Sequence, residues 1–160
     1  NYLMPSGPYG VGHKITRARG ETSPYVVVYY PIDRETYDKN VKKSGCSFML
    51  SGDKDVEGFS KIFKAPLFIF GTMKAYKLMS LQNAKLHSDF VDGEKKLTPV
   101  VLSHGLIGNS TFYATIAYFL ASYGCIVYAP THTDKSANYF KDITKTPPED
   151  VFYDDYNKDR

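Results

Sequence analysis

The sequence predicts an α/β fold, and three features of its second half carry this prediction. An apolar run over residues 98–102 ends shortly before Gly105, a helical pattern follows over residues 110–123, and a second apolar run spans residues 125–130. Apolar runs bounded by turn residues are typical of buried strands. Strand, helix and strand in this order form the βαβ unit of a parallel sheet.

The first third of the chain predicts two more strands and a long insertion. Residues 13–19 alternate weakly after a turn-rich lead-in at residues 7–12 and predict an edge strand. Residues 20–24 predict a hairpin loop, and the β-branched and aromatic residues 25–31 predict a strand that a proline ends. From residue 32 to residue 60 the apolar pattern gives way to charge, glycine and serine, which indicates a long surface insertion.

Residues 56–96 leave two interpretations open. Phe59, Ile62 and Phe63 lie at helical spacing, and Pro66 is placed to begin a second helix. Lysines then alternate with large apolar residues: Lys61, Lys64, Lys74 and Lys77 with Phe68, Ile69, Phe70, Met73, Leu78 and Met79. The favoured interpretation is a helix that covers the core with a solvated lysine face, since apolar stripes usually pack inward. The other is a basic, aromatic-rich helix that lies on a lipid interface.

The helix between the two C-terminal strands is the best defined in the sequence. Its large apolar residues recur at helical spacing: Phe112, Ile116, Phe119, Leu120 and Tyr123. Asn109 or Ser110 is a candidate N-cap, and Gly124 is a candidate terminator. Ala117 and Ala121 would allow this helix to pack closely on the sheet.

The C-terminal end of the chain is expected at the surface. Residues 131–140 predict a loop, and Pro147-Pro148 prevents regular structure directly after it. Phe152, Tyr153 and Tyr156 stand among aspartates, which predicts an acidic, aromatic segment and the start of a helix.

Two loops are candidates for a functional site, because ligands bind outside the carboxyl ends of strands in open parallel sheets. They are expected at residues 103–110 and 131–138. In the first loop, Gly105 and Gly108 stand on either side of Leu106. A backbone N–H at Leu106 could donate to a developing oxyanion. A tight turn that needs glycine for backbone reasons alone explains the pattern equally well.

No serine of the chain has the sequence context of a catalytic nucleophile. A nucleophile elbow requires G-x-S-x-G at a sharp turn from strand to helix. Residues 45–49 around Ser47 and residues 108–112 around Ser110 both lack the final glycine and that context. Ser110 also has a simpler role as a helix cap. We therefore assign the nucleophile to neither serine.

The histidines indicate acid–base or metal chemistry only weakly. His104 and His132 follow neighbouring predicted strands, and Asp134 is close to the second. Three ligands are possible here, yet no two share a helix or a standard metal spacing. Hydrogen bonds from both rings to the loop backbone are the favoured interpretation. His13 and His87 show no functional context, and neither a metal nor another cofactor is expected.

Composition places the chain among globular proteins. Of its 160 residues, 42% are hydrophobic and 23% are charged, which suffices for one folded core. A net charge of +3 is too small to indicate a nucleic-acid partner. The longest apolar run, residues 65–73, is shorter than the ~20 residues that a membrane-spanning helix requires. Cys46 and Cys125 form neither a disulfide framework nor a metal-ligand spacing, and no targeting signal indicates a compartment.

Three blocks of this sequence resemble the platelet-activating factor acetylhydrolase family (plasma and intracellular type II), which are serine esterases with the α/β-hydrolase fold. Residues 7–12 together with residues 29–31 are similar to the family's entry strands. Residues 99–106 are similar to its oxyanion strand and loop. Residues 120–127, with the loop at residues 132–140, are similar to its next helix, strand and loop.

The resemblance implies the N-terminal part of an α/β-hydrolase sheet, mixed and mostly parallel and truncated before the nucleophile elbow. Residues 1–160 would form a single partial domain with a variable insertion at about residues 34–96. Leu106 matches the position whose backbone N–H forms part of the family's oxyanion hole. The family's serine, aspartate and histidine would lie beyond Arg160, so this chain alone would be inactive. Residues 59–79 occupy the place of a membrane-surface helix in the secreted relative.

The activity that the resemblance implies for the full-length protein is hydrolysis of the sn-2 acetyl or short acyl ester of phospholipids such as platelet-activating factor. The expected partners are this phospholipid and a membrane or lipoprotein surface. A general carboxylesterase or lipase, or a non-catalytic lipid-binding hydrolase relative, are the alternatives. Without the nucleophile strand, the strand at residues 100–102 would have an open edge, which predicts an unstable or insoluble isolated chain.

Overall fold

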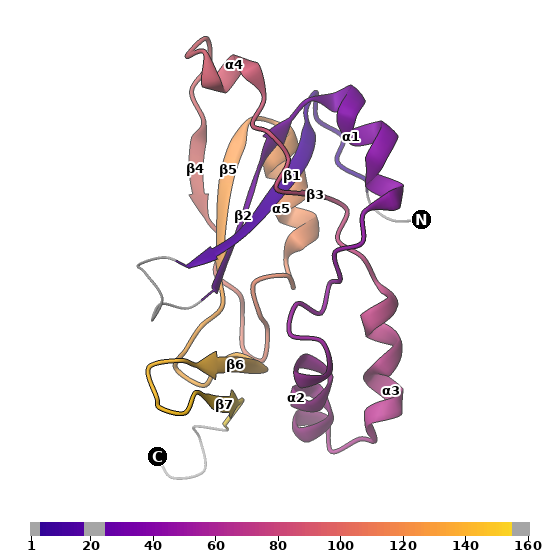
Figure 1. Cartoon of the computed structure of the whole chain (residues 1–160), viewed down its shortest axis with the longest axis vertical. Helices are drawn as coiled ribbons and strands as arrows, with labels where there is room; N and C mark the ends of the chain where they lie inside the picture. The colour runs from indigo at the N-terminus through magenta and orange to yellow at the C-terminus, as the bar shows by residue number, and fades with distance from the viewer. Residues whose placement is uncertain (1–3, 18–24, 155–160) are drawn as a thin grey trace.

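The strands form a five-stranded sheet and a separate hairpin in the computed structural model, which describes residues 4–17 and 25–154 (Figure 1). The described elements are, in chain order, β1 (Gly10–Arg17), β2 (Tyr25–Ile32), α1 (Arg34–Asn40), η1 (Val41–Lys43), α2 (Asp53–Phe63), α3 (Leu67–Gly71), η2 (Thr72–Ala75), β3 (Leu81–Gln82), α4 (Ser88–Val91), β4 (Thr98–Val101), α5 (Ala114–Ser122), β5 (Cys125–Pro130), β6 (Tyr139–Asp142) and β7 (Glu149–Phe152). The sheet order is β3-β1-β2-β5-β4. β1 with β3 and β4 with β5 are parallel, whereas β1 with β2 and β2 with β5 are antiparallel. The predicted α/β class and mixed sheet are confirmed, although parallel pairs do not outnumber antiparallel pairs among the described strands.

The predicted βαβ unit is present as β4, α5 and β5. β4 pairs in parallel with β5 from Thr98 opposite Cys125 to Val101 opposite Tyr128. α5 ends just before Gly124, whose φ of 96° is a left-handed conformation that glycine adopts readily. β4 lies at the edge of the described sheet, where Val101 is 73% exposed.

α5 packs on the sheet through Ala117, Ala121 and the buried Tyr118, whereas part of its predicted apolar stripe stays exposed. Ala117 and Ala121 are fully buried, as the predicted close packing requires. Ile116 and Tyr123, two members of the apolar stripe, are instead 48% and 62% exposed. Leu120, another member of the stripe, is partly buried and packs against the core, so the stripe is divided between the core and the surface.

α5 begins at Ala114 rather than near residue 110, so neither predicted N-cap is correct. Asn109 Oδ1 instead accepts a hydrogen bond from the Thr111 backbone N–H at 3.0 Å and closes a turn before the helix. The Ser110 backbone N–H donates to Thr131 Oγ1 at 3.2 Å. Both residues therefore fasten the loop between β4 and α5.

β1 is an inner strand and not the predicted edge strand. It begins at Gly10 and pairs with β2 along its whole length. The short β3 pairs with its other side at Gly12 and His13. A two-residue strand leaves no periodic pattern, so β3 could not be predicted. Residues 18–24, which include the predicted hairpin loop at residues 20–24, lie outside the described residues.

Residues 32–60 contain α1 and most of α2, so they are not only a surface insertion. Tyr37 in α1 is fully buried, and its hydroxyl donates to the Met79 carbonyl oxygen at 2.9 Å. In α2, Val56 and Phe59 are each 3% exposed. A few buried residues on one face of each helix suffice to pack it against the rest of the protein. Because charged residues surround them in the sequence, this pattern of burial was not recognised.

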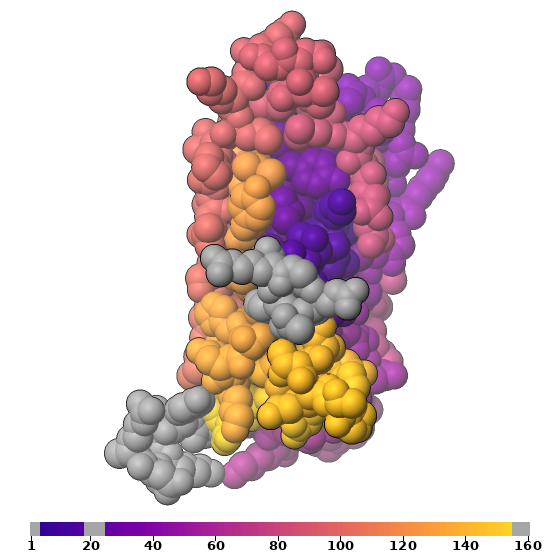
Figure 2. Space-filling model, turned by 60° about the vertical axis from the view of Figure 1, so that its left-hand side comes forward, coloured from indigo at the N-terminus to yellow at the C-terminus, as the bar shows by residue number. Residues whose placement is uncertain are grey.

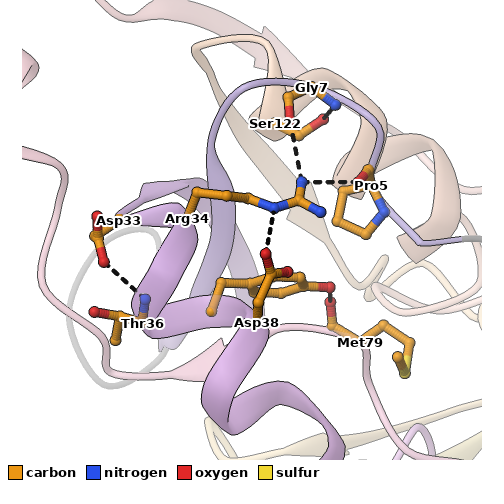
Figure 3. Close-up of polar contacts among 9 residues, drawn as sticks. Pro5, Gly7, Asp33, Arg34, Thr36, Asp38, Met79 and Ser122 are labelled. Carbon is orange, nitrogen blue, oxygen red and sulfur yellow. Dashed lines mark hydrogen bonds and ion pairs between the residues drawn. The ribbon is translucent and has the colours of Figure 1, made fainter.

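Arg34 attaches the N-terminal segment to α1 (Figure 3). Its Nη1 donates to the carbonyl oxygens of Pro5 and Gly7, each at 3.1 Å, and its Nε donates to Asp38 at 3.1 Å. The Gly7 backbone N–H donates to Ser122 Oγ at 3.1 Å, so the same segment is also joined to the end of α5.

α3 begins after Pro66, as predicted, but it does not cover the core. Phe68 is 78% exposed, Leu67 54% and Ile69 50%, and none of the described residues of α3 is buried. The interpretation that packs this apolar stripe inward is therefore wrong for α3, although Leu78 further along is buried. None of the described helices is long and apolar enough to cross a membrane.

The C-terminal segment forms the β6–β7 hairpin, and Phe152, where a helix was expected to start, is the last residue of β7. The part of that expected helix beyond residue 154 lies outside the described residues. The Lys61 ammonium lies 3.4 Å from the centroid of the Phe152 ring, and Lys54 pairs with Asp150 at 2.9 Å. These contacts attach the hairpin to α2. Figure 2 shows yellow residues of this C-terminal segment beside orange residues, in the lower part of the face drawn. Residues 155–160 lie outside the described residues.

Candidate active site

The loops that follow β4 and β5 lie side by side, as predicted from the order of the elements. Because the two strands are parallel neighbours, their carboxyl ends meet at one edge of the sheet. The Ile107 N–H donates to the Ser136 carbonyl oxygen at 2.7 Å, and the Asn138 N–H donates to the Gly108 carbonyl oxygen at 3.2 Å. These backbone hydrogen bonds join the two loops into one unit.

Leu106 lies at the tip of a tight turn in the first loop. The turn runs from Gly105 to Gly108 and is closed by a hydrogen bond from the Gly108 N–H to the Gly105 carbonyl oxygen at 3.1 Å. Leu106 is 65% exposed, and no residue in the described part of the chain accepts a hydrogen bond from its backbone N–H. This N–H is therefore available to a ligand at the carboxyl edge of the sheet.

The residue after Leu106 is held in a strained conformation. Ile107 has a φ of 61°, which is rare for a β-branched residue. Such strain persists only where surrounding contacts impose it, and the 2.7 Å bond from Ile107 to Ser136 is one such contact. The second loop thus fixes the backbone of the turn that presents Leu106.

His104 is buried between the two loops and forms hydrogen bonds with both. It is 5% exposed, and its Nδ1 donates to the Gly105 carbonyl oxygen at 2.8 Å, since a carbonyl can only accept. Its Nε2 accepts from the His132 backbone N–H at 3.0 Å. Only a neutral ring can accept at Nε2, and burial lowers the pKa of His104 accordingly. The predicted bonding to loop backbone is confirmed for His104.

His132 bonds to side chains instead. Its Nε2 lies 2.8 Å from Ser103 Oγ and its Nδ1 lies 3.0 Å from Ser136 Oγ. Its ring also stacks on His104 with centroids 3.8 Å apart. Asp134 accepts from the Ser136 N–H at 3.0 Å, and hydrogen bonding by the side chain and then the backbone of Ser136 lowers the pKa of Asp134. No group of three histidine, cysteine or acidic residues that could hold a metal occurs within the described ranges.

The contact between Ser103 and His132 was not expected from the sequence. A serine nucleophile needs a base that a third group orients, usually a carboxylate. His132 makes its second bond to the Ser136 hydroxyl, and Ser103 lies in the loop after β4 without a nucleophile elbow. We therefore interpret the contact between Ser103 and His132 as a structural hydrogen bond that connects the two loops. Its only sequence signal was the position of both residues after neighbouring strands.

The two serines in incomplete elbow motifs have structural roles. Ser47 Oγ donates to the Lys74 carbonyl oxygen and accepts from the Met49 N–H, both at 3.2 Å. Ser110 is 5% exposed beside Thr131. Neither serine contacts a histidine in the part of the chain that the structure describes, which supports leaving both unassigned.

The remaining two histidines lie outside this site. His13 is fully buried, with Nδ1 2.8 Å from Ser80 Oγ, and burial lowers its pKa from 6.5 to about 4. His87 precedes α4 and accepts from the Asp89 N–H at 3.2 Å. Both have structural contacts that the sequence did not reveal.

A buried polar network behind the loops was also missed by the sequence. Asp55 of α2 is 2% exposed and accepts from Asn138 Nδ2 at 3.2 Å. Asn138 Oδ1 accepts in turn from Asn109 Nδ2 at 3.2 Å. Burial raises the pKa of Asp55. The network borders a cavity of about 370 Å³ between α2, the start of β2 and the hairpin.

Comparison with known proteins places these features in a family. Residues 3–158 match the family model described as platelet-activating factor acetylhydrolase, isoform II. The chain is 28% identical over 141 residues to the platelet-activating factor acetylhydrolase of Cavia porcellus, which covers 86% of this chain and 30% of that protein. A ferulic acid esterase from Streptomyces cinnamoneus shares the fold, with a TM-score of 0.50, 17% identity, and coverage of 83% of this chain and 36% of that one.

Proposed function

Because the chain belongs to the platelet-activating factor acetylhydrolase isoform II family, we propose that it supplies the oxyanion loop of a serine esterase. The observation that carries the proposal is the free backbone N–H of Leu106 at the carboxyl edge of the sheet. The chain spans 30% of the length of its relative from Cavia porcellus, so the activity proposed is that of the full-length protein. Its substrate is the sn-2 acetyl or short acyl ester of a phospholipid such as platelet-activating factor.

The proposed chemistry is acyl transfer to a serine followed by hydrolysis. The serine, a second oxyanion donor and the acid and base come from the rest of the full-length protein, because the described residues contain no serine in a triad. As the serine attacks the ester carbonyl, negative charge develops on the carbonyl oxygen. A backbone donor aimed at this oxygen lowers the barrier by about 3–4 kcal/mol, and Leu106 is the proposed donor. Water then hydrolyses the acyl-enzyme.

We further propose that α3 and its neighbours form a lipid-facing surface. Its apolar part is Phe63, Leu67, Phe68 and Ile69, each at least half exposed. Lys61, Lys64 and Lys74 lie beside these residues in the sequence. Exposed aromatic and aliphatic side chains interleaved with lysines are suited to the boundary between lipid headgroups and acyl chains. In this proposal residues 34–96 are the variable segment that carries the surface to a membrane or lipoprotein.

The test is hydrolysis by the full-length protein of two choline phospholipids that differ only at sn-2. We expect efficient release of acetate from the 2-acetyl lipid and little release of a long acyl chain from its counterpart. Equal rates on both would favour a general carboxylesterase or lipase. Binding to vesicles without hydrolysis of either lipid would favour a non-catalytic lipid-binding protein.

A further inference from the structure

Asp55 is a buried carboxylate that the proposed chemistry does not use. It is 2% exposed, and it forms no ion pair with any of the described residues. Its Oδ2 accepts from the Ser51 N–H at 2.8 Å, and its Oδ1 accepts from Asn138 Nδ2 at 3.2 Å. Burying a carboxylate without a cation is costly, so the contacts that it makes must be well defined to keep it in place.

The network that begins at Asp55 ends in the turn that presents Leu106. Asn138 Oδ1 accepts from Asn109 Nδ2, and the Asn138 N–H donates to the Gly108 carbonyl oxygen, both at 3.2 Å. One asparagine therefore bonds to α2 through its amide nitrogen and to the candidate oxyanion loop through two other atoms. Each polar atom in this chain of contacts has a partner, which is the condition for a rigid buried network.

An aromatic contact joins the same helix to the same loop. Phe59 in α2 is 3% exposed, and its ring stacks on Phe112 with centroids 5.5 Å apart. Phe112 directly follows Thr111, whose backbone N–H bonds to Asn109 Oδ1. α2 thus holds the loop at two points, one polar and one apolar.

We propose that Asp55 is a positioning residue for the candidate oxyanion loop. By orienting Asn138, it holds Asn109 and Gly108 and so fixes the direction of the Leu106 N–H. This inference rests on the proposed esterase function. It adds that α2, the helix that leads into the exposed α3, determines the geometry of the loop.

The atoms of the network suggest a charge-conserving swap as the sharpest test. In Asp55→Asn, the introduced amide can accept only one of the two bonds, and its NH2 group then faces a donor. In the double variant Asp55→Asn with Asn138→Asp, the amide introduced at position 55 donates to the carboxylate introduced at position 138, which still accepts from Asn109. Only the 3.3 Å bond from Asn138 Nδ2 to the Asp55 backbone carbonyl oxygen is lost. Asp53→Asn is the matched control, because it removes an exposed carboxylate from the first turn of the same helix.

The experiment measures kcat and KM of the full-length variants on a soluble acetyl ester, together with amide hydrogen exchange of residues 103–111. For Asp55→Asn we expect kcat to fall about 10- to 100-fold with little change in KM, because misplaced catalytic groups lose rate. Exchange in the loop should rise. The swap should recover part of the lost kcat and part of the lost protection from exchange, and Asp53→Asn should match the unsubstituted protein.

The proposal is overturned if Asp55→Asn matches Asp53→Asn in kcat and in exchange, or if the swap recovers neither. Should Asp55→Asn fail to fold, the swap decides alone, since recovery supports the pairing and a lack of recovery overturns it. An unsubstituted full-length protein without esterase activity would contradict the proposed function instead. Hydrogen exchange would still report on the positioning in that case.

Discussion

Gly58 in α2 lies directly against the backbone of Asn138. A Cβ built on the glycine would lie 2.5 Å from the Asn138 carbonyl oxygen and 3.1 Å from its carbonyl carbon. Real Cβ atoms do not approach backbone atoms so closely, so α2 can dock on the loop after β5 only with glycine here. This contact sets the distance between α2 and the candidate site.

Gly58→Ala should therefore move α2 away from the loop. We expect the free energy of unfolding to fall by about 1–3 kcal/mol, the usual cost of overpacking, measured by chemical denaturation. Gly71→Ala is the control, because a Cβ at this helical glycine meets nothing within 4 Å. If both variants are equally stable, the close packing of α2 on Asn138 is not as described.

Because His13 is buried as a neutral ring, we expect the folded protein to lose stability in acid. Its pKa is lowered to about 4 by burial, so the folded state keeps the ring neutral while the unfolded chain takes up a proton below pH 6.5. The stability from this neutral ring is complete above pH 6.5 and is lost as the pH falls from 6.5 towards 4. The shift corresponds to about 3 kcal/mol.

His13→Asn should flatten this dependence, because the amide has no proton to gain and can still bond to Ser80. Denaturation at several pH values between 4 and 7 measures the slope for both proteins. His104, whose pKa is also lowered, should leave a smaller slope in the variant. An unchanged slope in His13→Asn would show that another group causes the acid sensitivity.

A substitution at Phe68 tests whether α3 forms a lipid-facing surface. Because its side chain is 78% exposed, Phe68→Ser should change stability by less than about 0.5 kcal/mol. Partition of the full-length protein to vesicles should fall about tenfold, since a large aromatic side chain no longer enters the interface. Val91→Ser in α4, which lies away from α3 at the top of Figure 1, is the matched control and should partition normally. Equal partition of both variants would contradict the lipid-facing role of α3.

The open edge of β4 is expected to cause self-association of the isolated chain. It pairs only with β5 among the described strands, and Val101 is 73% exposed. An exposed apolar edge promotes pairing between chains, and a lysine on the edge opposes it. The isolated chain should therefore self-associate, and Val101→Lys should delay this in light scattering. A cooperative, monomeric thermal unfolding transition of the unsubstituted chain would argue against an open edge.

The parts of the fold that the sequence predicted well are those with a local signal. β4, α5 and β5 follow from apolar runs and from Gly124, and the two site loops follow from the order of these elements. The close packing of Ala117 and Ala121 was predicted from their small size, but apolar spacing alone did not show that Ile116 would stay exposed. Which side chains of α5 become buried depends on how closely strands that are distant in the sequence approach the helix.

The buried network could not be predicted for a related reason. Asp55, Asn109 and Asn138 are far apart in the sequence, and each on its own is typical of a polar surface. Only the docking of α2 on the loops brings them together. The turn at Leu106, in contrast, was predicted from its glycines, although the strain at Ile107 was not.

The most direct test of the proposed function removes the Leu106 N–H and changes little else. Leu106 is the second residue of a four-residue turn, a position that favours proline, and its φ is not positive. Leu106→Pro in the full-length protein therefore deletes the donor, whereas Leu106→Ala keeps it. We predict that kcat for a soluble acetyl ester falls about 10²- to 10³-fold in Leu106→Pro, with KM little changed, and stays near the unsubstituted value in Leu106→Ala. A folded Leu106→Pro protein that retains full kcat would contradict the assignment of Leu106 to the oxyanion hole.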